Sequence, residues 1–295
     1  MFDAEPTNQL SLMKNRLLIT LTTLISIILP FLIGTSITNY SPYVETNSFQ
    51  AYVLIWAVIS IVFVSIVLLL LNYFPQSFER VGALLFLLIC PILGIIGLAA
   101  APDLSLKMLE HPEREHLRYI FLFIAALLSG ASILFLFKRN SLKIEKSTRW
   151  IVTVIFTVAF AEFIWEFTHH YLYPEALKEW ISQEKNVEEF GKNYDNYNII
   201  ILGVIGRFSQ FISIIWLSLH LYKLREIKIW SPIISIFLSL MGIISATVVY
   251  ITQFNFPKGF EFLMLFFIPG IPFLLLYWLG VALLTKFKKN EIAAY

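Results

Sequence analysis

Charged residues are scarce in this chain of 295 residues. Asp, Glu, Lys and Arg make up 14% of the sequence, whereas soluble domains carry about 25% charged residues. Hydrophobic residues account for 58% of the chain. This composition excludes an ordinary soluble globular protein and is typical of a protein that crosses a membrane several times.

Neither sign of charge is in excess, and cysteine is almost absent. The 22 Lys and Arg residues against 20 Asp and Glu residues leave a net charge of +2, which argues against nucleic acid as a partner. We expect membrane lipids and a small solute or ion as partners instead. The single cysteine, Cys90, excludes an intrachain disulfide, a CxxC redox motif and a thiolate metal cluster.

Long apolar stretches recur along the whole chain. About 20 apolar residues span a hydrocarbon core of roughly 30 Å, and we find eight stretches of this kind. They predict an all-α bundle of about eight transmembrane helices, a single transmembrane domain over residues 1–295, in the plasma (inner) membrane. The predicted spans are Leu17–Ile37, Ala51–Phe74, Val81–Pro102, Tyr119–Phe137, Trp150–Tyr171, Ile199–Tyr222, Ser231–Thr252 and Phe262–Phe287.

The distribution of Lys and Arg between the connecting segments predicts the orientation. Such residues accumulate on the cytoplasmic side of a membrane protein. With the N-terminus inside, 14 of the 22 fall in inner segments and seven, Arg114 and Arg118 among them, in outer segments. Both termini are therefore predicted to be cytoplasmic, with a short N-terminal segment over residues 1–16.

Two outer loops are long enough to carry structure of their own. Residues 103–118 and 172–198 each contain a capped amphipathic stretch, which predicts a short helix at the outer interface. The second loop is acidic, and a lid that collects cations is the alternative to a plain solvated loop. Either loop could also dock a protein partner.

The fifth predicted span carries an unusual polar stripe. Glu162, Glu166, His169 and His170 follow an i, i+4, i+7, i+8 spacing, which puts their side chains along one face of a helix. Ionisable residues inside a membrane are expensive and therefore mark functional positions. The stripe predicts an ion or proton site.

The sixth predicted span supplies Arg207 and Gln210 and runs in the opposite direction. At about 1.5 Å per residue, Glu162 and Glu166 lie about 2 Å and 8 Å outward of the midplane, and Arg207 about 6 Å outward. The arginine is therefore predicted to lie between the two carboxylates in depth.

Pairing explains how these charges enter a membrane. An isolated charge at the helix centre costs about 3 kcal/mol on insertion scales. Arg207 can neutralise one carboxylate, and the other then lies in a low dielectric that favours the protonated carboxyl. Such a group, with His169 or His170 leading outward, forms a proton relay. The alternative is an ion pair that only fixes the packing of the two spans.

A metal site is a second interpretation of the same region. His116, near the outer end of the fourth span, and His169, His170 and Glu166 of the fifth supply imidazole and carboxylate ligands that suit zinc. The HExxH motif is absent, however, and the histidine spacing matches no standard zinc signature. We therefore expect no cofactor, with zinc as the alternative.

Small residues and prolines indicate how the spans pack. Gly203 and Gly206 in the sixth span allow close approach of a neighbouring helix. The sequence Pro269-Gly270-Ile271-Pro272 predicts a kink or a break, whose freed backbone groups need partners inside the protein. The seventh span carries a comparable small-residue face formed by Ser235, Ser239, Gly242 and Ala246.

Three functions are compatible with these patterns. The polar cluster favours proton- or ion-coupled transport, or a channel-like activity. A non-catalytic subunit, sensor or assembly factor of a membrane complex is the first alternative, with the outer loops as docking surface. An intramembrane enzyme acting on lipid, with or without zinc, is the second alternative. No nucleophile motif supports it, so a non-enzymatic function is favoured.

Overall fold

The fold of the chain is helical throughout the part that the structure describes. A computed structural model describes residues 17–18, 20–32, 46–72, 78–99, 105–139 and 142–293. These residues form helices and turns and contain no strand, so the predicted all-α class is confirmed. The predicted N-terminal segment, residues 1–16, lies outside the described residues.

Seven long helices carry the architecture, after a first apolar helix over Thr20–Leu32. Shorter elements lie between them and complete the described chain. The long helices are α2 (Thr46–Asn72), α3 (Phe78–Ala99), α4 (Pro112–Arg139), α5 (Lys146–Tyr171), α8 (Tyr197–Lys223), α9 (Trp230–Thr252) and α11 (Gly270–Ala293). The short ones are η2 (Leu106–Glu110), α6 (Tyr173–Ser182), η3 (Val187–Glu189), α7 (Phe190–Tyr194), η4 (Glu261–Leu263) and α10 (Met264–Phe267).

Three of the described helices are long and apolar enough to cross a membrane. They are Lys146–Ser182, in which α6 continues α5, Tyr197–Lys223 and Trp230–Thr252. The pair Glu261–Phe267 and Gly270–Leu284, bent by 63°, makes a fourth if it counts as one span. These helices coincide with the last four predicted spans. The total of eight spans and the cytoplasmic location of both termini stay predictions.

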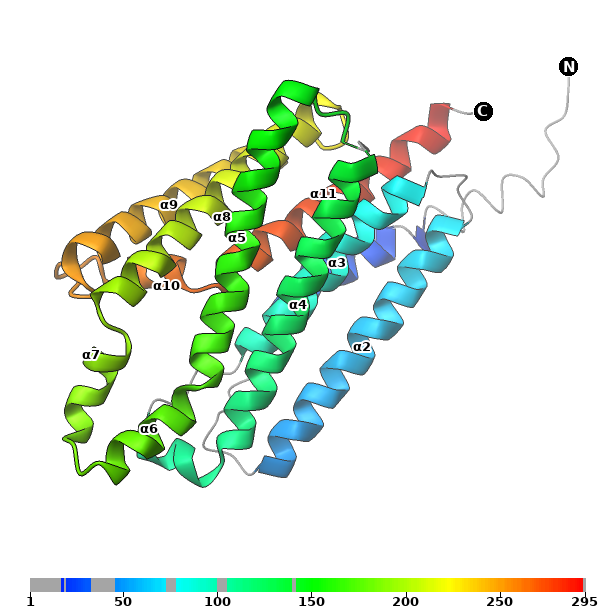
Figure 1. Ribbon diagram of the computed structural model, residues 1–295. Coiled ribbons are helices and arrows are strands. Elements are labelled where there is room, and N and C mark those ends of the chain that lie inside the picture. Colours follow the sequence, from blue (N-terminus) through cyan, green and yellow to red (C-terminus); the bar gives the residue numbers. More distant parts are fainter. Residues whose placement is uncertain are drawn as a thin grey trace, which may run out of the picture.

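The helices pack as a bundle (Figure 1), and its core is formed by aromatic and aliphatic side chains. Helices α3, α4, α5, α8 and α11 form a ring, since each packs on the next and α11 returns to α3. Helix α2 packs outside α3, and α9 packs on α8 and α10. Inside the ring Phe163 of α5 stacks on Phe273 of α11, with their ring centroids 4.7 Å apart.

Glycines allow the closest helix contacts, as a bundle without a strong hydrophobic driving force between helices requires. A Cβ at Gly280 of α11 would lie 2.7 Å from the Leu87 carbonyl oxygen of α3. A Cβ at Gly242 of α9 would lie 2.1 Å from the Phe211 ring of α8. The small-residue face of α9 is buried, and α9 packs on α8 as that pattern predicts.

Short helices cover one end of the bundle, opposite the C-terminus (Figure 1). Met108 of η2, Tyr173 and Leu177 of α6 and Phe190 of α7 share a small apolar core there. We call η2, α6, η3 and α7 the end cap. Both predicted outer loops therefore contain short helices; their location at a membrane interface stays a prediction.

Candidate ion and proton site

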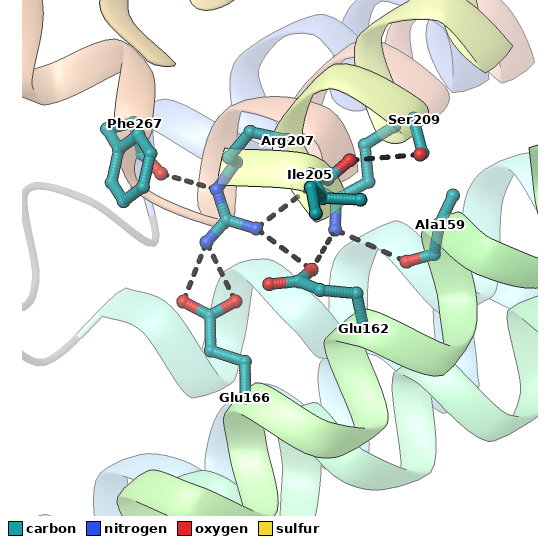
Figure 2. A network of polar contacts seen from close by, with 8 residues as sticks. Ala159, Glu162, Glu166, Ile205, Arg207, Ser209 and Phe267 are labelled. Carbon is teal, nitrogen blue, oxygen red and sulfur yellow. Dashed lines mark hydrogen bonds and ion pairs between the residues drawn. The ribbon is translucent and has the colours of Figure 1, made fainter. Parts of the chain in front are cut away.

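The polar cluster lies where α5, α8 and the break between α10 and α11 meet (Figure 2). Glu162 and Glu166 lie one turn apart on α5, and Arg207 projects toward them from α8. The helical period thus presents both carboxylates to one guanidinium, as the sequence predicts. Gln210 lies one turn further along α8 on the same face.

Arg207 is fully buried, and all its N–H groups have acceptors. A guanidinium has five N–H donors in a fixed planar arrangement. Nη2 donates to Oε1 and Oε2 of Glu166, at 2.7 Å each. Nη1 donates to Gln210 Oε1 at 2.9 Å and to Glu162 Oε2 at 3.4 Å. Nε donates to the backbone carbonyl of Phe267 at 2.5 Å.

Glu162 is only partly satisfied by these contacts. Its Oε2 accepts from Gln210 Nε2 at 2.5 Å, and the same amide nitrogen lies 3.3 Å from the Ala159 carbonyl. Its Oε1 is buried and has no hydrogen-bond partner among the described residues. Because one guanidinium faces two carboxylates, the cluster carries one negative charge when both are ionised and none when one is protonated.

Gly206 makes room for the Glu162 side chain. A Cβ at Gly206 would lie 2.0 Å from Glu162 Cδ and 2.2 Å from Oε2, far inside van der Waals contact. The sequence predicts close helix packing here. The structure places a buried carboxylate, held by Arg207 and Gln210, directly over the α8 backbone.

The Phe267 carbonyl is a site group that sequence reasoning missed. Helix α10 ends at Phe267, Ile268 is extended (φ −63°, ψ 135°), and α11 begins at Gly270. In a continuous helix Ile271 N–H would donate to Phe267, but here it donates to Ile268 at 3.2 Å. The freed carbonyl accepts from Arg207 instead. Pro269 predicts the break in the helix. It does not predict which side chain donates to the freed carbonyl.

The two histidines of the polar stripe, His169 and His170, contact different elements. His169 Nε2 lies 2.9 Å from Asp195 Oδ1 beside α7, and its ring stacks on Tyr194 at 4.2 Å. Burial and the nearby Asp195 carboxylate raise the pKa of Tyr194 to about 12, so its hydroxyl stays protonated and donates to the His169 carbonyl at 2.6 Å. His170 stacks on Tyr119 of α4, with centroids 5.6 Å apart. His169 therefore joins α5 to the end cap, and His170 faces α4.

The predicted zinc ligands have separate partners. His116 Nε2 lies 3.0 Å from Glu175 Oε1, and its ring stacks on Tyr171. His169 contacts Asp195 and Glu166 contacts Arg207. Within the described ranges no group of three His, Cys, Asp or Glu side chains is arranged to hold a metal ion. The structure does not bring His116, His169, His170 and Glu166 together as one ligand set.

A second buried charged group lies at the N-terminal end of α4, and here the sequence interpretation was wrong. It counts Arg114 and Arg118 as loop residues, because they precede the apolar run of the fourth span. Helix α4 instead begins at Pro112, and Arg114, Glu115 and Arg118 are all less than 7% exposed. Arg118 Nη1 donates to Glu115 Oε2 at 2.5 Å, and the guanidinium lies 5.1 Å from the centroid of the Tyr119 ring.

The described part of the protein is thus all-helical, with three to four helices of membrane-spanning length and a Glu–Arg–Gln cluster between them. No known protein family, no curated protein and no solved structure matches the chain.

Proposed function

We propose that the protein moves a small solute or ion across the membrane in a proton-coupled manner, with Glu162 as the proton carrier. The observation that supports this proposal is the shared guanidinium: Arg207 faces the buried carboxylate of Glu162 and the partly buried carboxylate of Glu166, and Glu162 Oε1 has no partner among the described residues. A proton on Oε1 removes the excess negative charge without disturbing any contact of Oε2. The plasma membrane is the proposed location.

The two carboxylates have different roles in this proposal. Glu166 accepts two hydrogen bonds of 2.7 Å from one guanidinium nitrogen, a strong charge-assisted contact, so it acts as the fixed partner of Arg207. Glu162 contacts Arg207 only at 3.4 Å and otherwise contacts the neutral amide of Gln210. Glu162 therefore exchanges its proton more readily than Glu166 does.

A change in protonation at Glu162 changes the affinity of the cluster for any cation. In a buried site the interaction between charges is several times stronger than in water. Removing the proton leaves a net negative charge beside Arg207, which favours entry of another proton or cation. This dependence of one cation on another is what coupled transport requires.

A line of polar side chains continues from the cluster toward the end cap. His170 lies one turn beyond Glu166 on α5 and stacks on Tyr119. Next to Tyr119 lies the Arg118–Glu115 pair at the outer end of α4. Histidine and carboxylate groups at such spacing are suited to passing protons between the cluster and the solvent.

Proton uptake by reconstituted liposomes tests the proposal. Vesicles that contain a pH-sensitive dye are given an inside-negative potassium diffusion potential, alone and with panels of amino acids, sugars, organic acids and cations. We expect acidification of the interior above that of protein-free vesicles, under at least one of these conditions. Glu162→Gln should abolish it, whereas Glu179→Gln, at an exposed position of α6, should not.

Two results would contradict the proposal. One is no proton movement by the parent protein under any condition of the panel. The other is full activity of Glu162→Gln, because a cluster that only fixes helix packing tolerates an amide of the same shape.

A further inference from the structure

The break between α10 and α11 is held in place by side chains from two other helices. Arg207 of α8 donates to the Phe267 carbonyl at 2.5 Å, and Ser245 of α9 donates to the Leu263 carbonyl at 2.6 Å. The two halves of the broken segment meet at 63°. Backbone groups freed at membrane depth need such partners, so the position of α10 depends on these donors.

Helix α10 is short, and its packing is concentrated at Phe267, whose ring lies against the apolar cluster of Val204, Ala246 and Val249 and 5.4 Å from the Phe254 ring. The helix has four residues, none of them buried, and Met264 and Leu265 are half or more exposed. Segments with few buried contacts open at low cost in free energy. Loss of one strong hydrogen bond is therefore a substantial part of what holds α10 against α8.

The acceptors of Arg207 compete for its guanidinium. Figure 2 shows the Phe267 carbonyl and the Glu162 carboxylate on opposite sides of this group. With Glu162 protonated, Glu166 is the only anion among its acceptors, and the neutral Phe267 carbonyl keeps Nε. With Glu162 ionised, a second anion faces Nη1 at 3.4 Å, well beyond the roughly 2.8 Å of a charge-assisted contact. Closing that distance draws the guanidinium toward α5 and away from Phe267.

We propose that α10 and its break form a gate that Arg207 closes when Glu162 is protonated and releases when Glu162 is ionised. This inference rests on the proposed proton site and gives its proton a structural effect. In this gate the position of α10, 60 residues beyond Arg207 in the sequence, depends on the charge of Glu162 on α5.

The groups that act on Glu162 agree with a proton-dependent gate. Glu166 of the same helix repels its charge, and Arg207 and Gln210 of α8 stabilise it. On α10 the Phe267 carbonyl also accepts a hydrogen bond from Arg207, so Phe267 and Glu162 share this guanidinium. His170 lies one turn beyond Glu166 on α5 and stacks on Tyr119 of α4, next to the Arg118–Glu115 pair.

Distances between spin labels test the gate directly. Labels are attached to cysteines introduced at Leu265 of α10 and Leu202 of α8, both exposed, in a Cys90→Ser background. Pulsed electron paramagnetic resonance then gives the distance distribution in liposomes over a range of pH. We expect a second, longer population to grow as the pH rises, displaced by about one helical turn, roughly 5 Å.

Three variants decide the origin of the shift. Glu162→Gln, which imitates the protonated carboxyl, should keep the short distance at every pH. Glu179→Gln on α6 is the matched control and should respond as the parent does. Arg207→Lys keeps the charge but loses the planar guanidinium and should show the longer population at every pH.

The outcomes separate the gate from the transport proposal. A distance that does not depend on pH in the parent, or an unchanged pH response in Glu162→Gln, overturns the gate. If Arg207→Lys fails to fold, the Glu162→Gln result still decides. A pH response that Glu162→Gln abolishes, without proton flux in liposomes, removes the transport proposal and leaves the gate.

Discussion

Replacing Gly206 by alanine tests the geometry of the cluster with a single added methyl group. The new Cβ would lie 2.0 Å from Glu162 Cδ and 2.1 Å from its Cγ. The carboxylate cannot simply rotate away, because Gln210 and Arg207 hold it and its surroundings are buried. The substitution must therefore displace Glu162 or push α5 away from α8.

Gly203, one turn earlier on α8, supplies the matched control. A Cβ there would lie 3.7 Å from the Phe267 ring, an ordinary contact. Both Gly→Ala changes gain up to about 1 kcal/mol of helix propensity, which cancels when the two variants are compared. The remaining difference is the cost of overpacking, so Gly206→Ala should be about 1–3 kcal/mol less stable than Gly203→Ala.

Equilibrium unfolding in mixed micelles, followed by tryptophan fluorescence, measures this difference. Adding Glu162→Ala to Gly206→Ala removes the clashing atoms and should cost less stability than Glu162→Ala costs in the parent. Equal stability of the two glycine variants, or additivity of Gly206→Ala and Glu162→Ala, would refute the packing of Glu162 against α8.

Three further predictions concern charge, topology and metal. Arg207→Leu should cost about 3 kcal/mol of stability, because it leaves the buried Glu162 and the partly buried Glu166 without their cation. Adding Glu166→Gln should recover more of that loss than adding Glu162→Gln, since Glu166 has the stronger contact with Arg207, and a double-mutant cycle without coupling would refute the pairing. Cysteines introduced at Gln183 and Arg225 in a Cys90→Ser background should react with an impermeant reagent from outside and inside respectively; the reverse pattern would invert the predicted orientation. Elemental analysis of protein purified without a histidine tag should find only substoichiometric zinc, and one equivalent per chain would restore the metal-dependent alternative.

Local periodicity was enough to predict the helical class and the main members of the site. Apolar runs of about 20 residues predict helices, and the long described helices coincide with those runs. The i, i+4 spacing of Glu162 and Glu166 puts both on one face, and depth along antiparallel helices predicts Arg207 as their partner. These features follow from the period of the α-helix and from the free-energy cost of an unpaired charge in a membrane.

Contacts between distant segments depended on the tertiary structure. Spacing along a helix does not determine how neighbouring helices rotate and approach, so it could not predict that Gly206 lies under Glu162. It also could not assign His169 to Asp195 at the end cap. Arg118 was read as a loop residue because it precedes the apolar run, and the sequence did not indicate that α4 begins at Pro112 or that this turn is buried.

The Phe267 carbonyl shows most clearly which features the sequence predicts and which depend on the tertiary structure. Pro269 and Gly270 indicate that the helix breaks, since proline has no N–H to donate and restricts the residue before it. Which donor then satisfies the freed carbonyl depends on the element that packs against the break. In this fold that element is α8, and the donor is the same guanidinium that holds Glu166 and faces Glu162. Only the packing of α8 against the break, which no local sequence pattern encodes, brought the carbonyl into the site.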